Sequence, residues 1–208
     1  MGKIVYDGFH KIEELEVDIK GNKRKIERLG INHAVAGIVC DADNKIALVV
    51  QYRPCVDEVM YEIPAGLLDK NESLQETLIQ ELEEECGINR NNIARITEFP
   101  LNYYMACGSS NAEMNILMVK LDSVEETKKV DDGDVEKVEW LSFEDFKTLV
   151  LKGKIKDGKT LMSYYVLDKM EFLKCEGGGK MKNKKAIVIL LVGVMLITTL
   201  ASVFASLL

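Results

Sequence analysis

Alternating and continuous apolar segments predict a chain built mainly of short β-strands. Gly21-Asn22 is a typical hairpin turn between two alternating segments, and the polar residues 41–44 separate two apolar runs, so two hairpins are expected. The segments expected to form strands are Glu13–Lys20, Arg24–Arg28, His33–Cys40, Ile46–Tyr52, Val59–Ile63, Ile93–Phe99, Met114–Leu121 and Val135–Leu141.

Three segments have helical patterns. The clearest begins at about Leu74, where Ser73 and Glu76 form a capping box, and ends at Gly87. Its apolar stripe repeats at a spacing of four and consists of Leu74, Leu78, Leu82 and Cys86, widened by Ile79. Ser142 is expected to cap a second helix, and a third is expected over about Gly158–Leu173. The resulting fold class is α+β, a mixed sheet between helices with an N-terminal hairpin appended.

The helix expected after Ser73 is strongly acidic. From Glu72 to Gly87 there are six glutamates in sixteen residues and no Lys or Arg. Glu81 and Glu85 lie one turn apart, where like charges cost about 0.2–0.5 kcal/mol. Both also lie at the edge of the apolar stripe, where a desolvated carboxylate needs compensation. We therefore expect a hard divalent cation there, held by oxygen ligands.

The other glutamates of this segment are expected to have different surroundings. Glu76 and Glu83 point away from the stripe and are expected to be solvated. Glu84 lies further round than Glu85 and is expected to bind the cation directly or through water. Glu72 either accepts a hydrogen bond within its own loop or contacts the metal, and the pattern leaves both readings open.

These residues resemble the Nudix box. The match runs from Gly66 through Glu72 to the segment 80–88, Gln-Glu-Leu-Glu-Glu-Glu-Cys-Gly-Ile, and so spans 23 residues. One position departs, because the family has Arg where this chain has Gln80. In the family that Arg helps to orient the neighbouring glutamate, so the departure predicts weakened catalysis or an altered metal site within the same fold, a Nudix-type α/β/α sandwich.

Flanking segments are similar to ADP-ribose pyrophosphatases over roughly residues 4–173. The resemblance implies that Glu81 and Glu85, in some members with Glu84, bind Mg²⁺ or Mn²⁺ together with the backbone carbonyl of Ala65. It also implies that Arg53 contacts the diphosphate and that Glu62 lies in the substrate cleft. Without the resemblance, Arg53 would be read as an exposed ion-pair partner.

A loop after the box is expected to supply the general base. Similar loops in the family carry a glutamate at the position of Glu113, and the alternative is an exposed loop acid. Tyr103 and Tyr104 either stack on a nucleotide base or pack on opposite faces of a strand. The subfamily usually has a proline in the following turn, where this chain has Ala106-Cys107-Gly108.

Composition indicates a reduced, acidic catalytic domain. Five cysteines show no paired spacing and no CxxC motif, which argues against a zinc site. No apolar leader precedes the charged N-terminal stretch, so a reducing cytoplasm is expected. The net charge is −7 for the whole chain; Lys180, Lys182, Lys184 and Lys185 contribute +4, so residues 1–179 carry −11. This balance argues against nucleic acid as a partner.

The C-terminal segment differs in kind from the rest of the chain. Residues 186–208 are 23 residues without a charge, enough to cross a bilayer as a helix. The four lysines directly before them predict that this flank stays on the cytoplasmic side of the cell membrane. The predicted organisation is an N-terminal extension (1–32), a Nudix domain (33–174), a Gly/Lys linker (175–185) and a transmembrane tail anchor (186–208). A homodimer paired through the N-terminal hairpin is implied by the resemblance alone.

Three functions follow as hypotheses. The favoured one is Mg²⁺-dependent hydrolysis of ADP-ribose to AMP and ribose 5-phosphate. The second is a Nudix hydrolase for another nucleotide sugar, motivated by Cys107. The third, motivated by Gln80, is a weakened Nudix domain that binds a nucleotide and reports to a membrane partner.

Overall fold

The computed structural model of the chain describes residues 2–8, 10–68, 72–122 and 135–170. Tertiary contacts divide the chain into two compact units, Met1–Tyr165 and Val166–Leu208. Of the second unit only residues 166–170 are described, and they form the end of a helix. The predicted linker and tail anchor at residues 175–208 lie outside the described residues. Among the helices that the structure describes, none is long and apolar enough to cross a membrane.

Three strands at the N-terminus form a small antiparallel sheet. Its order is β1 (Lys3–Asp7), β2 (Lys11–Ile19) and β3 (Asn22–Gly30). The predicted hairpin is confirmed, but its turn is formed by Lys20 and Gly21, with φ of 55° and 82°. Both values lie in the left-handed region that two-residue hairpin turns require. The sequence pattern did not predict β1.

The second sheet is mixed. Its main order is β10-β5-β4-β9-β8, and β6 and β7 are attached to β5 and β4. Only the β4–β9 pair is parallel among the described pairs. The strands are β4 (Ala34–Cys40), β5 (Ile46–Arg53), β6 (Glu58–Glu62), β7 (Ala65–Leu67), β8 (Ile93–Tyr104), β9 (Glu113–Leu121) and β10 (Val135–Leu141).

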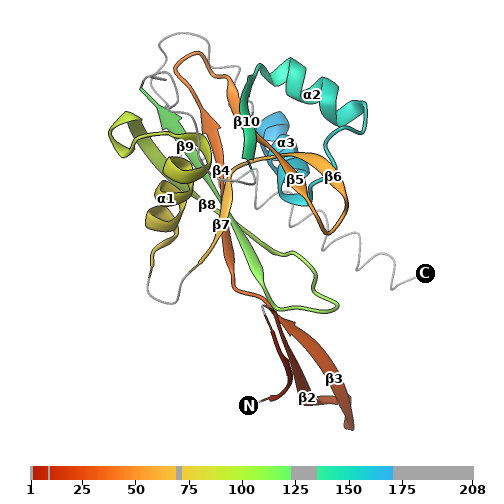
Figure 1. Cartoon of the computed structure of the whole chain (residues 1–208). Coiled ribbons are helices and arrows are strands. Elements are labelled where there is room, and N and C mark those ends of the chain that lie inside the picture. Colours follow the sequence, from red (N-terminus) through yellow and green to blue (C-terminus); the bar gives the residue numbers. More distant parts are fainter. Residues whose placement is uncertain (1, 9, 69–71, 123–134, 171–208) are drawn as a thin grey trace, which may run out of the picture. The chain divides into compact units, whose positions relative to one another are not determined.

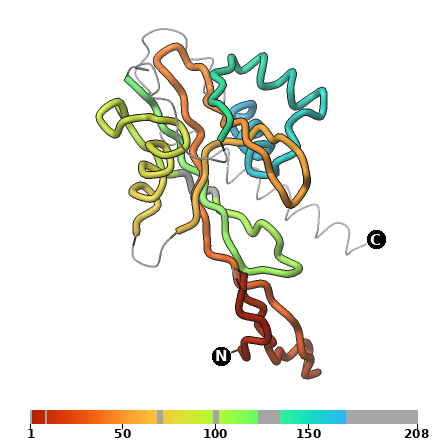
Figure 2. The backbone as a smooth tube through the Cα atoms, viewed as in Figure 1, coloured from red at the N-terminus to blue at the C-terminus, as the bar shows by residue number. Residues whose placement is uncertain are grey.

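Strands β4 and β5 diverge soon after their turn. They form the predicted hairpin, but their register pairs only Cys40 with Ile46. Beyond that point β5 pairs with β6 and β4 pairs with β7. The chain crosses from β6 to β7 through Ile63 and Pro64, and Figure 2 shows this path in the backbone tube. The opening between β4 and β5 therefore brings the end of β6 and the start of the box to the middle of the sheet.

Local sequence signals determine the ends of the helices. In α1 (Leu74–Cys86) the Ser73 side chain accepts from the Glu76 N–H, and Gly87 ends the helix with φ of 64°. In α2 (Phe143–Leu151) the Ser142 side chain accepts from the Asp145 N–H. The third helix, α3, covers Gly158–Met170, and the predicted last residues 171–173 lie outside the described part. All three predicted helices are confirmed within these bounds.

Helices cover the buried mixed sheet. Every residue of β4 is buried, and α1 packs its apolar stripe against alternate residues of that strand, with Leu78 and Leu82 in one cluster with Val35 and Val39. Figure 1 shows α1 on one side of the sheet and α2 and α3 on the other. Phe146 of α2 is fully buried and meets Tyr164 of α3 edge to face. This arrangement is the α/β/α sandwich that the sequence predicted.

Candidate active site

Helix α1 presents two glutamates to the strand that begins the box. Glu85 is buried, and its Oε2 accepts a hydrogen bond of 3.2 Å from the backbone N–H of Ala65. Glu81 is half-buried, one turn earlier, and its carboxylate occupies the space where a Cβ on Gly66 would lie. Gly66 is therefore required for this close approach, because any side chain there would displace Glu81.

The two carboxylates of this pair repel each other. Burial raises the pKa of Glu85 to about 7; the Ala65 N–H opposes that shift, and the charge of Glu81 adds to it. Two neighbouring carboxylates, one of them buried, are expected to attract a cation. Glu81 and Glu85 thus meet the backbone of the box, whereas Glu76 and Glu83 are exposed to solvent.

The donor set fits a hard divalent ion. Glu81, Glu85 and the carbonyl of Ala65 would supply oxygen ligands, the type that Mg²⁺ and Mn²⁺ prefer. In the described ranges no three His, Cys, Asp or Glu side chains converge to hold an ion by themselves. Water or substrate oxygens would therefore have to complete the coordination, as is usual for Mg²⁺. Glu84 is exposed on the same helix, and its role as a ligand stays a prediction.

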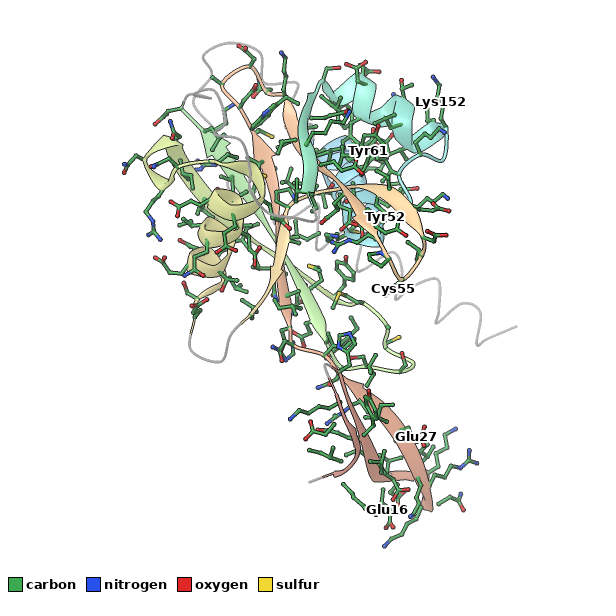
Figure 3. All side chains as sticks on the ribbon, viewed as in Figure 1. Glu16, Glu27, Tyr52, Cys55, Tyr61 and Lys152 are labelled. Atoms are coloured by element: carbon green, nitrogen blue, oxygen red, sulfur yellow. The ribbon has the colours of Figure 1, made fainter. Side chains whose placement is uncertain are left out.

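A second cluster is centred on Glu62, the last residue of β6. Arg53 of β5 donates two hydrogen bonds of 2.7 Å to it, from Nε and Nη2. Lys159 of α3 pairs with the same carboxylate and lies 3.2 Å from Asp157. Tyr52 and Tyr61, labelled in Figure 3, lie on the same two strands as this cluster, and Cys55 lies at their turn.

The cluster keeps Glu62 ionised. Burial alone would raise the pKa of Glu62, but the hydrogen bonds from Arg53 and the charge of Lys159 outweigh it and lower the pKa to about 2. The guanidinium has five N–H donors, and the two bonds to Glu62 leave others for a phosphate. Sequence reasoning placed Arg53 and Glu62 separately at the substrate; the structure brings them together as one ion pair.

The two clusters are electrostatically coupled. The positive charges of Lys159 and Arg53 both act to lower the pKa of Glu85. Burial and the charge of Asp157 raise the pKa of Tyr103 to about 12, so Tyr103 of β8 also borders this region as a neutral phenol. Tyr104, the next residue, is exposed, which fits the reading in which the two tyrosines face opposite sides of the strand.

Glu113 and Glu72 line a pocket of about 550 Å³ whose lining includes neither Arg53 nor Glu62. Its other lining residues are Ile31, Asn32, His33, Leu68 and Asn115. Glu113 is the first residue of β9; its N–H donates to His33 Nδ1, and its carboxylate accepts from Asn102. Glu72 accepts a hydrogen bond of 3.2 Å from the Thr77 hydroxyl, so its observed partner lies in α1 and not in its own loop. The pocket places Glu113 beside Glu72 rather than beside Arg53 and Glu62.

Glu76 and Glu83 have the outward positions expected of them. Both are exposed; Glu76 forms an ion pair with Arg90, and Glu83 accepts from the backbone N–H of the same residue. Gln80 is likewise exposed on α1. Three residues that the sequence analysis did not single out, Asp157, Lys159 and Thr160, belong to the site. Their signal in the sequence was Asp157 directly before the predicted third helix, a typical capping position.

Comparisons with known proteins identify the family of the chain. The family model of the NUDIX domain matches residues 31–164. The ADP-ribose pyrophosphatase of Bacillus subtilis is 30% identical over 169 residues, which are 79% of this chain and 87% of that protein. The Methanol dehydrogenase activator of Bacillus methanolicus is 27% identical over 165 residues, 79% of this chain and 86% of that protein.

The fold has a counterpart among solved structures. A crystal structure of an ADP compounds hydrolase superposes with a TM-score of 0.64 at 17% identity, and the match covers 83% of this chain and 92% of that one. At this identity the likeness concerns the fold. Taken with the box and the carboxylate pair on α1, the comparisons show that this chain belongs to the Nudix family. It is a Nudix hydrolase.

Proposed function

We propose that the protein hydrolyses ADP-ribose to AMP and ribose 5-phosphate with Mg²⁺. The observation that carries the proposal is the meeting of Glu81 and Glu85 with the Ala65–Gly66 backbone, within the electrostatic reach of Arg53 and Lys159. The similarity to an ADP-ribose pyrophosphatase over most of both chains supports the substrate class.

Each of the site residues would have its own role in the hydrolysis. Glu81, Glu85 and the Ala65 carbonyl would hold the ion, which, when bound, neutralises phosphoryl charge and acidifies a water molecule. Arg53 would orient one phosphoryl group with its remaining N–H donors, while Glu62 holds the guanidinium in place. Glu113 would accept a proton from the attacking water. Each of these contacts is most useful when it is strongest to the transition state.

A hydrolysis panel tests this function directly. Full-length protein with Mg²⁺ is offered ADP-ribose, GDP-sugars and other nucleoside diphosphate derivatives, and the products are identified by chromatography. We expect AMP and ribose 5-phosphate from ADP-ribose. Turnover confined to other nucleotide sugars would favour the hypothesis motivated by Cys107, which lies exposed in the β8–β9 loop. Binding without turnover of any compound would favour the sensor hypothesis motivated by Gln80.

We also propose that residues 186–208 tether the enzyme to the cytoplasmic face of the cell membrane. The support is the uncharged run of 23 residues preceded by four lysines. In fractionated cells, the full-length protein should remain with membranes after alkaline carbonate extraction. Recovery in the soluble fraction would contradict the tether.

A homodimer paired through the N-terminal sheet is proposed on separate grounds. This sheet carries exposed apolar side chains, namely Ile4, Val5, Tyr6, Ile19 and Ile26. Exposed apolar side chains of this size are candidates for burial in a protein interface. Sedimentation should give a dimer that Tyr6→Lys dissociates, and a monomeric wild-type protein would contradict the proposal.

A further inference from the structure

Two adjacent residues of α3 contact Glu62, the last residue of β6, and Ile63, which follows it. Lys159 pairs with the Glu62 carboxylate, and the Thr160 Oγ1 accepts a hydrogen bond of 2.9 Å from the Ile63 backbone N–H. Both contacts are shielded from solvent, because the Lys159 side chain is only 10% exposed and Thr160 is fully buried. We call Asp157, Lys159 and Thr160 the α3 clamp.

Asp157 fixes the other two members of the clamp. Its Oδ2 accepts from the backbone N–H of Thr160 at 2.9 Å and from the Thr160 hydroxyl at 2.6 Å. The hydroxyl thus donates to Asp157 while it accepts from Ile63, so its direction is determined at both ends. Asp157 also lies 3.2 Å from the Lys159 ammonium. One carboxylate therefore orients both side chains that reach β6.

The segment held by the clamp is the one that supplies the active-site backbone. After Ile63, the Pro64 carbonyl accepts from the Gly37 N–H at 2.9 Å, and the Ala65 N–H donates to Glu85 at 3.2 Å. The Pro64 carbonyl and the Ala65 N–H belong to one planar peptide unit, so these two contacts fix that unit. The Ala65 carbonyl belongs to the next unit, in β7, which is held by its pairing with β4. On the other branch, Glu62 holds the guanidinium of Arg53 with two hydrogen bonds. The clamp thus acts on the metal ligand through Thr160 and on the phosphate contact through Lys159.

We propose that Thr160 and Lys159 are positioning residues with separate effects: Thr160 sets the Ala65 carbonyl for the metal, and Lys159 sets Arg53 for the diphosphate. The effect on turnover rests on the function proposed above, whereas the effect on metal affinity does not. A merely stabilising role explains the arrangement poorly. A buried ion pair is seldom more stable than an apolar replacement of similar size, so the polar clamp is better explained by the geometry it imposes.

Thr160 is tested by metal affinity. Thr160→Val keeps the shape of the side chain and removes both hydrogen bonds, whereas Thr160→Ser keeps the hydroxyl. Mn²⁺ binding to the full-length protein is measured by calorimetry, well below the melting temperature of each variant. Groups that orient metal ligands typically change metal affinity by about 10–100-fold when removed. We expect the Val variant to bind Mn²⁺ at least about 10-fold more weakly and the Ser variant to restore most of the affinity.

Lys159 is tested by the dependence of turnover on ADP-ribose. Lys159→Met removes the charge and keeps most of the apolar stem, and Lys159→Arg keeps the charge. The Met variant should raise KM for ADP-ribose about 10-fold, an orienting effect like that expected for Thr160. Its Mn²⁺ affinity should change much less than the KM, and only towards tighter binding, because a positive charge that acts on Glu85 is removed. The Arg variant should recover the KM. Because this arm does not depend on Thr160→Val, it remains decisive if that variant fails to fold.

The outcomes separate the possible failures. A Val variant with a lower melting temperature but full Mn²⁺ affinity would overturn the role of Thr160 and leave it structural. An unchanged KM in the Met variant, or a change in metal affinity as large as that in KM, would overturn the role of Lys159. If wild-type protein binds Mn²⁺ but does not hydrolyse ADP-ribose, the proposed function fails, while the calorimetric comparison still decides the role of Thr160.

Discussion

The Arg53 guanidinium holds the Glu62 carboxylate with two hydrogen bonds of 2.7 Å, and this pair links the β5–β6 hairpin to the active site. The carboxylate is buried while the side chain of Arg53 is 43% exposed. The inner partner is thus fixed and the outer one is accessible to a ligand. An arginine held in this way has lost rotamer freedom before a phosphate binds, which lowers the entropic cost of recognition.

Acid should destabilise the protein partly through Glu62. Its pKa is lowered from 4.5 to about 2 in the folded protein. A lowered carboxylate pKa stabilises the fold above pH 4.5, and that contribution, on the order of 3 kcal/mol, is lost as the pH falls through the folded value. Chemical denaturation between pH 5 and about 2 should therefore show a shallower loss of stability in Glu62→Gln than in wild type. Parallel curves would contradict the assignment.

Gly66→Ala should abolish most of the activity. A Cβ at this position overlaps the Glu81 carboxylate, so that ligand must move. Loss of one electrostatic contact to the transition state typically costs about 100-fold to 1000-fold in rate, and we expect a fall in kcat of that size.

Gly108→Ala is the matched control for this substitution. It lies in the β8–β9 loop, where a Cβ would meet no atom within 4 Å, so the same chemical change should leave the rate unaffected. Equal effects of the two substitutions would show that the close approach of Gly66 to Glu81 has no special role.

Gln80→Arg restores the residue found in the Nudix box of the family. Gln80 is exposed on α1, directly before Glu81. If the orientation of Glu81 limits the reaction, an arginine there should raise kcat by about 10-fold or more, equivalent to about 1.4 kcal/mol in the barrier. Steady-state kinetics with ADP-ribose provide the measurement. An unchanged rate would refute the idea that the orientation of Glu81 limits the reaction.

Glu113→Gln tests the proposed general base. Removal of a general base typically lowers the rate by about 100-fold to 10,000-fold, and KM should change little. Glu113 lines the pocket with Glu72, and its N–H donates to His33. Glu98 is exposed on the neighbouring strand β8, so Glu98→Gln serves as the control. If Glu113→Gln retains full activity, it is an ordinary acid at the start of a strand.

Local signals in the sequence were sufficient for the helices and for part of the site. Ser73, Glu76 and Gly87 act within one or two turns of α1, so its ends followed from neighbouring residues. The positions of Glu81 and Glu85 at the edge of the apolar stripe followed from helical periodicity alone. The Nudix box then indicated which backbone segment they meet.

Long-range contacts could not be read in the same way. Lys159 and Glu62 are 97 residues apart, and nothing in their local patterns indicates that α3 reaches the end of β6. Strands β4 and β5 diverge where β7 pairs with β4 and β6 pairs with β5. An apolar run in the sequence does not reveal these pairings. The strand β1 was missed because all its residues are exposed, so no buried face marks it in the sequence. Its pairing with β2 is a contact that the local pattern does not reveal.

Divalent-cation binding by the carboxylate pair is the central claim, and calorimetry tests it most directly. Mn²⁺ is titrated into full-length wild-type protein and into a double variant that carries both Glu81→Gln and Glu85→Gln. The control is the single variant Glu83→Gln, because Glu83 is an exposed glutamate on the same helix. We predict that wild type and Glu83→Gln bind the ion with similar affinity, and that the double variant loses binding together with Mg²⁺-dependent hydrolysis. Absence of binding to the wild-type protein, or undiminished binding by the double variant, would contradict the account.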